Sequence, residues 1–261
     1  AGTVIREDNN FFNSTSSIID PVTNTPEIMT TRLPDGSNTL GFDSGIINIP
    51  NAGNTLIANG ASSATISLGS NLDIYYFYFN AFAIEIIAPN IVLTKIVEDE
   101  LGNDIGGQIV DLGDSLYYTI GFQNTGNDDT TDLTIRDIIP TNIVFNYPAD
   151  IEFLPPGVTV QSYNPTTREL IFSVDKDVVE ENDPVSSIRF KVTVVSTCSL
   201  LSDACSNNID NQAYSTYKGT INPDFIISDD PSYNTNSGCL LTPGATNFLA
   251  DINDCTFEED V

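Results

Sequence analysis

The sequence predicts an all-β protein made of tandem β-sandwich domains. Stretches in which apolar and polar residues alternate recur along the chain and are bounded by Asn, Asp, Gly and Pro, and this two-residue period is typical of half-buried strands. Periodicity of the helical kind is almost absent. A length of 261 residues suits two domains, and an apolar content of 40% is enough for a core in each.

The first domain is expected to be a β-sandwich over residues 1–89. Its strands are predicted at residues 64–68, 74–79 and 83–87, because turn-forming residues separate these apolar stretches. Pro89 marks the end of the domain, since a proline cannot donate to a strand ladder and holds the residue before it in an extended conformation.

The second domain, residues 90–218, is predicted to be an immunoglobulin-like sandwich. Alternation is cleanest where Ile188, Phe190 and Val192 alternate with polar residues, so one face of that strand is buried and the other is wet. About seven strands are expected, the number typical of the immunoglobulin fold. They are residues 91–97, 115–122, 132–139, 151–153, 170–174, 188–195 and 209–217.

The last residues, 219–261, are expected to form a loop-rich, disulfide-stapled extension that leads into a longer chain, because they are rich in Asn, Asp, Ser and Pro. The cysteines contain no CxxC pair of the kind found in metal and redox sites. Their even number favours two disulfides and an oxidising, extracellular compartment. Three pairings can be drawn, and we favour 198 with 205 and 239 with 255. The cysteines are Cys198, Cys205, Cys239 and Cys255.

The chain is strongly acidic, with 36 Asp and Glu residues against 9 Lys and Arg and a formal net charge of -27. Such a charge repels phosphate backbones and anionic lipid surfaces, which excludes nucleic acid as a partner. No apolar run approaches the roughly 20 residues of a membrane-spanning helix, so no membrane insertion is expected.

One short motif is similar to a catalytic one. Residues 113–116 spell the Gly-Asp-Ser-Leu motif of an esterase family, whose serine needs a histidine as its general base. The chain contains no histidine, the commonest general acid-base and zinc ligand. We therefore expect no enzymatic activity and no cofactor, and an extracellular hydrolase is the weakest of the functions considered.

Several short motifs of the second domain together resemble the DUF11 repeat of bacterial surface proteins. They are residues 91–95, 112–120, 124–126, 137–140 and 211–213, and they cover roughly residues 91 to 218.

With the preceding β domain and the Cys-containing tail, these motifs also resemble the large adhesins of flavobacteria, in the Bacteroidetes, that are linked to gliding motility and exported by the type 9 secretion system. The resemblance implies an extracellular location on the bacterial cell surface, outside the outer membrane. It also implies a role in cell adhesion.

Two functions without catalysis are therefore expected. The first is a segment of a cell-surface adhesin or filament that serves attachment and gliding motility, with other surface or filament proteins or surface glycans as partners. The alternative is a carbohydrate-binding module, in which the aromatic residues 75–79 present one face to a sugar. The absence of tryptophan weighs against this alternative.

The most specific candidate site consists of Lys95, Asp137 and Asn211. On three predicted strands each shares a face with apolar residues, so all three point inward. This set resembles the self-forming isopeptide triad of bacterial surface sandwiches, in which a neutral lysine amine attacks an asparagine carboxamide. Burial favours the neutral forms of a lysine and an aspartate, which the reaction requires. The alternative is a structural ion pair, with the lysine stem reaching toward solvent.

Acidic loops offer the oxygen ligands that calcium prefers, and Asp128, Asp129 and Asp132 form the candidate calcium site. No loop has EF-hand spacing. Solvated turns on an acidic protein are the alternative interpretation of these carboxylates.

Two tripeptides, residues 114–116 and 129–131, resemble the O-glycosylation signal of Bacteroidetes, in which Asp precedes Ser or Thr. Ser115 and Thr130 are therefore candidate O-glycosylation sites, although two matches in so polar a chain can also arise by chance.

Overall fold

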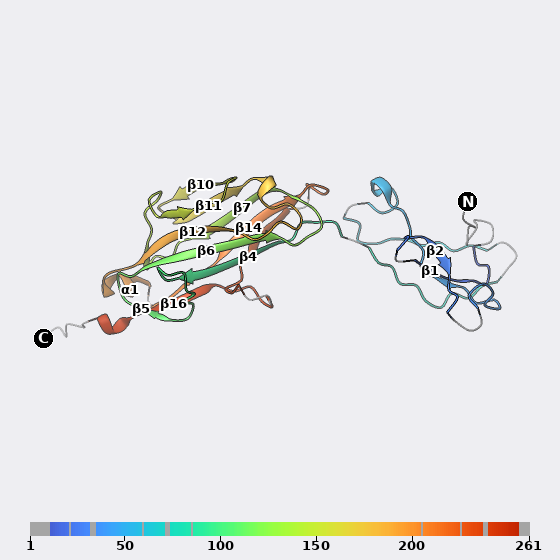
Figure 1. The fold of residues 1–261 in the computed structure, drawn as a ribbon, viewed down its shortest axis with the longest axis horizontal. Helices are drawn as coiled ribbons and strands as arrows, with labels where there is room; N and C mark the ends of the chain where they lie inside the picture. The colour runs from blue at the N-terminus through green and yellow to red at the C-terminus, as the bar shows by residue number, and fades with distance from the viewer. Residues whose placement is uncertain are drawn as a thin grey trace. The chain divides into compact units, whose positions relative to one another are not determined.

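The structure is a computed structural model that describes residues 11–255 apart from residues 21, 32–34, 59, 71–73, 85, 205, 225 and 237–239. Nearly every regular element in these residues is a strand, which confirms the all-β prediction (Figure 1). The chain divides into two compact units, residues 1–77 and 78–261, each described by itself. The boundary at residue 89 and the independence of the two domains remain predictions.

The first unit contains a small sheet of order β2-β1-β3, made of β1 (Ser16–Ile19), β2 (Pro26–Ile28) and β3 (Ser44–Gly45). One 3-10 helix, η1 (Ala52–Asn54), follows. The buried side chains of this sheet region are small and polar, including Ser16 and Thr39.

The described residues of the three strands predicted for the first domain, 64–68, 74–79 and 83–87, belong to no sheet. Most of their large apolar side chains are exposed. The strand prediction differs from the structure because alternation marks a sequence that fits a pleated surface, whereas a strand also needs a neighbour with which to form a ladder.

The second unit is a sandwich of two main sheets (Figure 1). One has the order β10-β11-β7-β14-β15, and the other has the order β4-β6-β12-β8, with β9 also paired to β12. All strands predicted in this domain are present, although the last is divided. The strands are β4 (Ile91–Glu98), β6 (Ser115–Asn124), β7 (Thr130–Ile138), β8 (Ile143–Val144), β9 (Ile151–Phe153), β10 (Val158–Asn164), β11 (Glu169–Val174), β12 (Ser186–Val194), β14 (Ala213–Gly219) and β15 (Ile226–Pro231).

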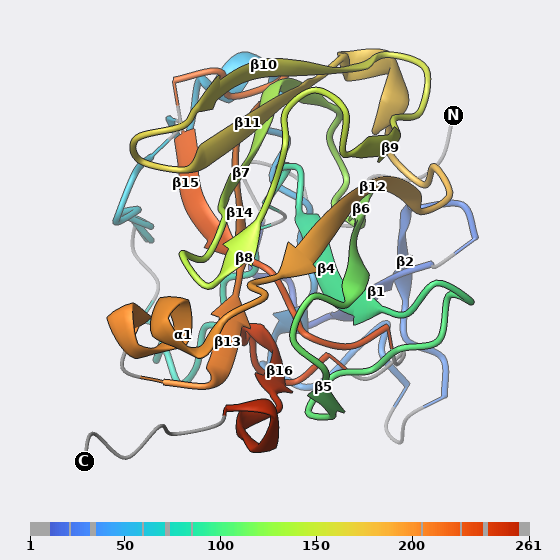
Figure 2. The ribbon, with the colours of Figure 1, turned by 90° about the vertical axis from the view of Figure 1, so that its left-hand side faces the viewer.

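A third, smaller sheet has the order β13-β16-β5 and lies with α1 at one end of the sandwich (Figure 2). The strand predicted at residues 209–217 divides at Gln212, so that β13 enters the small sheet and β14 enters a main sheet. The elements are β5 (Ile109–Val110), β13 (Asn208–Asn211), β16 (Thr246–Ala250), α1 (Cys198–Ala204) and the 3-10 helices η2 (Lys176–Val178) and η3 (Ile252–Asp254).

The segment that follows residue 218, expected to be loop-rich, contributes β15 and β16 to these sheets. Phe248 of β16 is fully buried in the apolar core. Between the two strands, Ser232 N donates to Ala213 O at 2.9 Å and Tyr233 N donates to Leu93 O at 2.9 Å. The tail therefore joins β14 of one main sheet to β4 of the other and closes that edge of the sandwich.

The core between the main sheets is apolar and rich in aromatic rings. Phe190 of β12 packs against Tyr118 and Phe145, with ring centroids 5.6 Å away in both cases, and against Phe172 at 6.3 Å. Each such side chain, when fully buried, stabilises the fold by about 1.5 to 3 kcal/mol relative to exposure. The alternation of apolar and polar residues predicted this face of β12 correctly.

A disulfide joins Cys198, where α1 begins, to Cys255, which follows η3. The preferred pairing of 198 with 205 and 239 with 255 is therefore wrong. It rested on short sequence spacing, whereas β16 runs beside β13 and returns the distant tail toward α1. Cys205 and Cys239 lie outside the described residues.

We expect the double substitution Cys198→Ser with Cys255→Ser to lower the free energy of unfolding by about 2 to 4 kcal/mol, since the bridge closes a long loop in the unfolded chain. The residues are 57 apart in sequence. Urea denaturation of the two proteins measures the difference. Thiol labelling of Cys198 or Cys255 in the native, unreduced protein would contradict the bridge.

Candidate functional site

Lys95 lies on the inward face of β4 and is fully buried. Its neighbours on that face, Leu93 and Val97, are apolar and also buried. Its backbone is held from both sides, because Lys95 pairs with Ile120 of β6 and its N–H donates to Tyr233 O at 2.7 Å. The strand therefore fixes where the long side chain enters the core.

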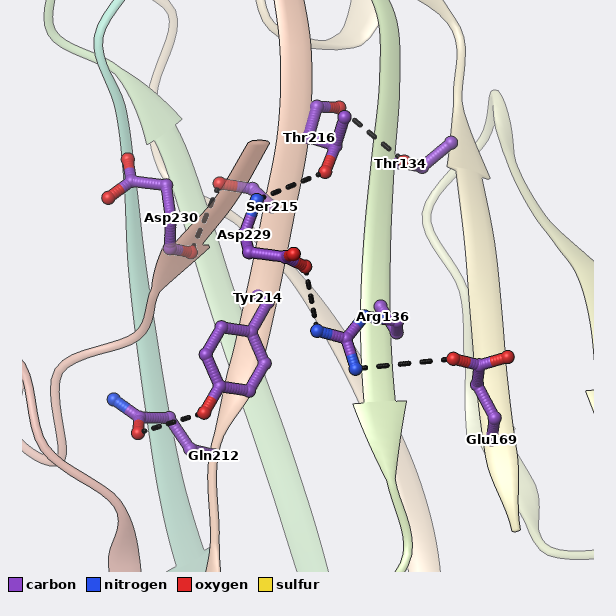
Figure 3. Close-up of polar contacts among 9 residues, drawn as sticks. All are labelled: Thr134, Arg136, Glu169, Gln212, Tyr214, Ser215, Thr216, Asp229 and Asp230. Carbon is purple, nitrogen blue, oxygen red and sulfur yellow. Dashed lines mark hydrogen bonds and ion pairs between the residues drawn. The ribbon is translucent and has the colours of Figure 1, made fainter. Parts of the chain in front are cut away.

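Asp137 lies on the inward face of β7 and is also fully buried. The preceding residue, Arg136, points to the opposite face of the sheet, as strand alternation requires. There its guanidinium binds Asp229 at 2.7 Å, approaches Glu169 at 4.0 Å and lies 4.8 Å from the Tyr214 ring centroid (Figure 3). Arg136 thus links β7 to β11 and β15 on the outer face of the sheet, while strand alternation points Asp137 inward.

Asn211 is the last residue of β13, and only 4% of it is exposed. The next residue, Gln212, donates from its side chain to Ser232 O at 2.9 Å where the chain passes from one sheet to the other. Ala213 then donates to Ser232 Oγ at 3.1 Å and pairs with Asp137 in the sheet. This crossing brings the asparagine side chain beside Asp137.

The structure brings the three predicted residues together around one carboxylate. Lys95 Nζ donates to Asp137 Oδ2, and Asn211 Nδ2 donates to Asp137 Oδ1 at 3.0 Å. These partners are 42 and 74 residues apart in sequence, so the contacts exist only in the folded domain. In an isopeptide reaction the lysine nitrogen enters the new amide bond and the asparagine nitrogen leaves. Here each of these nitrogens is hydrogen-bonded to one oxygen of the same carboxylate.

Aromatic rings shield the amine from water. Lys95 Nζ lies 4.3 Å from the ring centroid of Tyr118 and 5.6 Å from that of Phe190. Burial lowers the pKa of Lys95 to about 8, although the nearby Asp137 carboxylate opposes this shift. A larger fraction of this amine is therefore neutral near pH 7 than of an ordinary lysine amine.

The three carboxylates of the candidate calcium site do not converge. Asp128 accepts hydrogen bonds from Thr220 and Ile221, while Asp129 accepts one from Glu181 N at 2.8 Å. The Asp132 carboxylate contacts Lys218 at 3.2 Å. Across the described part of the chain, no three acidic or cysteine side chains gather as a metal site would require.

The two candidate glycosylation sites differ in accessibility. Ser115 opens β6 and is half-buried, whereas Thr130 is fully buried at the start of β7. A glycan cannot be accommodated on Thr130 in the folded domain, so the match at residues 129–131 does not mark a usable site there. Ser115 remains a prediction.

Two features of the site were missed from the sequence. Residues 232–233 close the sandwich edge beside Lys95, and no sequence pattern indicated it, because their pairing is an isolated bridge rather than a strand. Tyr118 is fully buried under the amine. Alternation with Leu116 and Ile120 on β6 would have placed Tyr118 on the inward face, so this signal was available.

Comparisons with known proteins leave the family of this chain open. No family model matches the sequence, and no curated protein matches it either. Among the residues that the structure describes, no helix combines the length and the apolar character needed to cross a membrane.

Several solved structures are similar in part. The major pilin SpaD from Corynebacterium diphtheriae matches with a TM-score of 0.38 at 14% identity, over 58% of this chain and 39% of that chain. A variant of BcpA, the major pilin subunit of Bacillus cereus, matches with a TM-score of 0.39 at 10% identity. The match covers 62% of this chain and 40% of that chain. The C-terminal domain of AspA, an antigen I/II-family protein of Streptococcus pyogenes, matches with a TM-score of 0.37 at 16% identity. The match covers 60% of this chain and 46% of that chain.

This chain thus spans less than half the length of those three structures. With every one of these TM-scores below 0.5, the function has to be argued from the site itself.

The buried lysine predicts a pH dependence in the Asn211→Ala variant, in which no amide bond can form. Between about pH 8 and 10.5 the unfolded lysine binds more protons than the folded one, so stability should rise with pH by roughly 1 to 3 kcal/mol. Below that window both states are protonated and the dependence ends.

Urea denaturation from pH 7 to 10.5 measures this slope. The matched control is the Asn211→Ala protein that also carries Lys95→Met, which lacks the titrating amine. Equal slopes in the two variants would show that Lys95 keeps an ordinary pKa.

Proposed function

We propose that this chain is a non-catalytic segment of a bacterial cell-surface adhesin or filament, and that its sandwich locks itself with an amide bond between Lys95 and Asn211. The observation that supports the bond is the single buried carboxylate of Asp137, which holds the lysine amine and the asparagine amide together. An extracellular location is supported by the disulfide and by the acidic composition.

The bond forms in two steps. The neutral Lys95 amine attacks Cγ of Asn211, forming the C–N bond while the carbonyl electrons move to Oδ1. Protonated Asp137 then gives its proton to Nδ2 and takes the amine proton on its other oxygen, as the old C–N bond breaks and the carbonyl re-forms. One ammonia leaves, no oxidant is needed, and Asp137 ends in its starting state.

Each residue is placed for its part. The aromatic rings exclude water and the lowered pKa of Lys95 supplies neutral amine. Asp137 Oδ1 already accepts a hydrogen bond from the nitrogen that must leave. Holding the reacting groups in this geometry replaces an encounter in solution with an intramolecular step.

The bond would join β4, where the sandwich begins, to the end of β13. Three strands follow Asn211, so it does not lie on the last strand of the domain as the sequence suggested. A pulling force on the sandwich would then load a covalent bond rather than a ladder of hydrogen bonds. This property suits a surface protein that attaches cells under shear.

The narrower assignment to gliding-motility adhesins exported by the type 9 secretion system is part of the proposal. It is supported by the DUF11-like motifs, of which residues 91–95, 137–140 and 211–213 contain the triad. Other surface or filament proteins are the proposed partners.

The substitution Asp137→Ala tests the proposed bond. Wild-type protein should be lighter than its sequence mass by one ammonia, and a cross-linked peptide should survive reduction and digestion. The variant should keep its full mass and lose about 3 to 5 kcal/mol of stability, because it leaves a buried amine without its partner.

Asp132→Ala is the matched control, since this carboxylate lies on the same strand as Asp137, is 73% exposed and binds Lys218 of β14 rather than a residue of the triad. It should show the wild-type mass loss. A wild-type protein at its full sequence mass would refute the bond and return the triad to the role of a structural ion pair.

A second function, glycan binding, is favoured by one observation. Tyr76, Tyr78 and Phe79 are 78%, 83% and 81% exposed, so this aromatic segment is accessible. Aromatic faces of this kind stack on sugars. Binding on a glycan array by the wild type, abolished by Tyr76→Ala with Tyr78→Ala, would support a carbohydrate-binding module.

A further inference from the structure

Tyr118 is buried beside the triad, and its hydroxyl has no hydrogen-bond partner. The residue is fully buried on β6, and its ring lies 4.3 Å from Lys95 Nζ. Its Oη is one of the few buried side-chain oxygen or nitrogen atoms in the described residues that make no hydrogen bond. Phenylalanine would fill the same space without burying a polar group.

An unsatisfied buried hydroxyl destabilises the folded state, because its hydrogen bond to water is lost and not replaced. Native structures keep few such groups, and each calls for a reason. The environment of Tyr118 indicates one. Burial is the largest influence on its pKa and raises it, as does the negative charge of Asp137, while a polar interaction with the Asn211 side chain lowers it. The hydroxyl therefore stays protonated near the Asn211 side chain, and it is available as a donor because no atom meets hydrogen-bond geometry with it in the resting site.

The reaction at Asn211 creates an acceptor that the resting site lacks. When the Lys95 amine attacks Cγ, negative charge develops on Asn211 Oδ1. Asp137 cannot stabilise this charge, because it is itself an acid-base group and its two oxygens hold the two nitrogens. A neutral donor on the remaining side of the carboxamide is needed.

We propose that Tyr118 is a catalytic residue of amide-bond formation, whose hydroxyl donates a hydrogen bond to Asn211 Oδ1 as that oxygen becomes negatively charged. The inference rests on the bond proposed above. A donor that has no partner in the resting site and gains one in the transition state lowers the barrier without stabilising the starting state. In a dry site such a donor is worth far more than in water.

The substitution Tyr118→Phe removes the hydroxyl and keeps the ring against Lys95 and Phe190. We expect ammonia loss to slow by roughly 100-fold to 1000-fold, the usual effect of removing one oxyanion donor. The measurement is the intact mass of full-length protein against time after a pulse of cell-free synthesis, at several pH values. The midpoint of the pH–rate profile should not move, because Lys95 sets it.

Tyr217→Phe is the matched control. Tyr217 is also buried, but its hydroxyl accepts from Ile91 N at 3.2 Å and donates to Asp230 at 3.2 Å. Its removal should lower stability and leave the rate of ammonia loss unchanged. In the Asp137→Ala background, where no bond forms, Tyr118→Phe should keep or raise the melting temperature, because it removes an unsatisfied group.

The outcomes separate the two proposals. If wild-type protein loses ammonia and Tyr118→Phe loses it at the same rate, the proposed role of Tyr118 is overturned, whereas the proposed bond is supported. A fall in melting temperature in the Asp137→Ala background would also overturn it, by showing that the hydroxyl is structural. No ammonia loss in wild type would refute the bond itself, and the role of Tyr118 with it.

Discussion

Removal of the Lys95 amine from water is the constraint on which the rest of the site depends. An unpaired charge in the interior of a sandwich costs several kcal/mol, so the fold must either neutralise the amine or give it a partner. The structure does both in part, because burial lowers the pKa of Lys95 and Asp137 binds the amine. These two influences leave a lysine that is held in place and is still able to act as a nucleophile.

The surrounding fold follows from the need to keep that site closed. The crossing at Gln212 turns the chain from the small sheet into the main sheet and leaves Asn211 facing Asp137. The segment at Ser232 and Tyr233 then binds β14 and β4 with backbone hydrogen bonds and closes the edge beside Lys95. Since these contacts join residues distant in sequence, the site is assembled only when the whole domain has folded.

The sequence predicted the triad because strand alternation alone decides which face a side chain occupies. Lys95, Asp137 and Asn211 each share a face with apolar residues, and all three are buried together. Their mutual contact was not a consequence of alternation. It depends on which strands are neighbours, and the resemblance to known triads supplied that part of the prediction.

The errors have the same origin. The strands predicted at residues 64–68, 74–79 and 83–87 have a strand-like pattern and no ladder partner among the described residues. The Cys198–Cys255 bridge depends on β16 returning beside β13, which short-range spacing does not reveal. The local pattern of the sequence predicted which face of each sandwich strand is buried. The path of the tail, the disulfide partners and the closure of the site depend instead on pairing between residues distant in sequence.

Pulling single molecules of the full chain from its two ends under reducing conditions tests the central claim most directly. If Lys95 and Asn211 are covalently joined, the residues between them should not add to the contour length when the wild-type domain unfolds. In Asp137→Ala the domain should unfold at a lower force, and these residues should then add to the contour length. Extension of the wild-type chain by its full length, including the stretch from Lys95 to Asn211, would contradict the account.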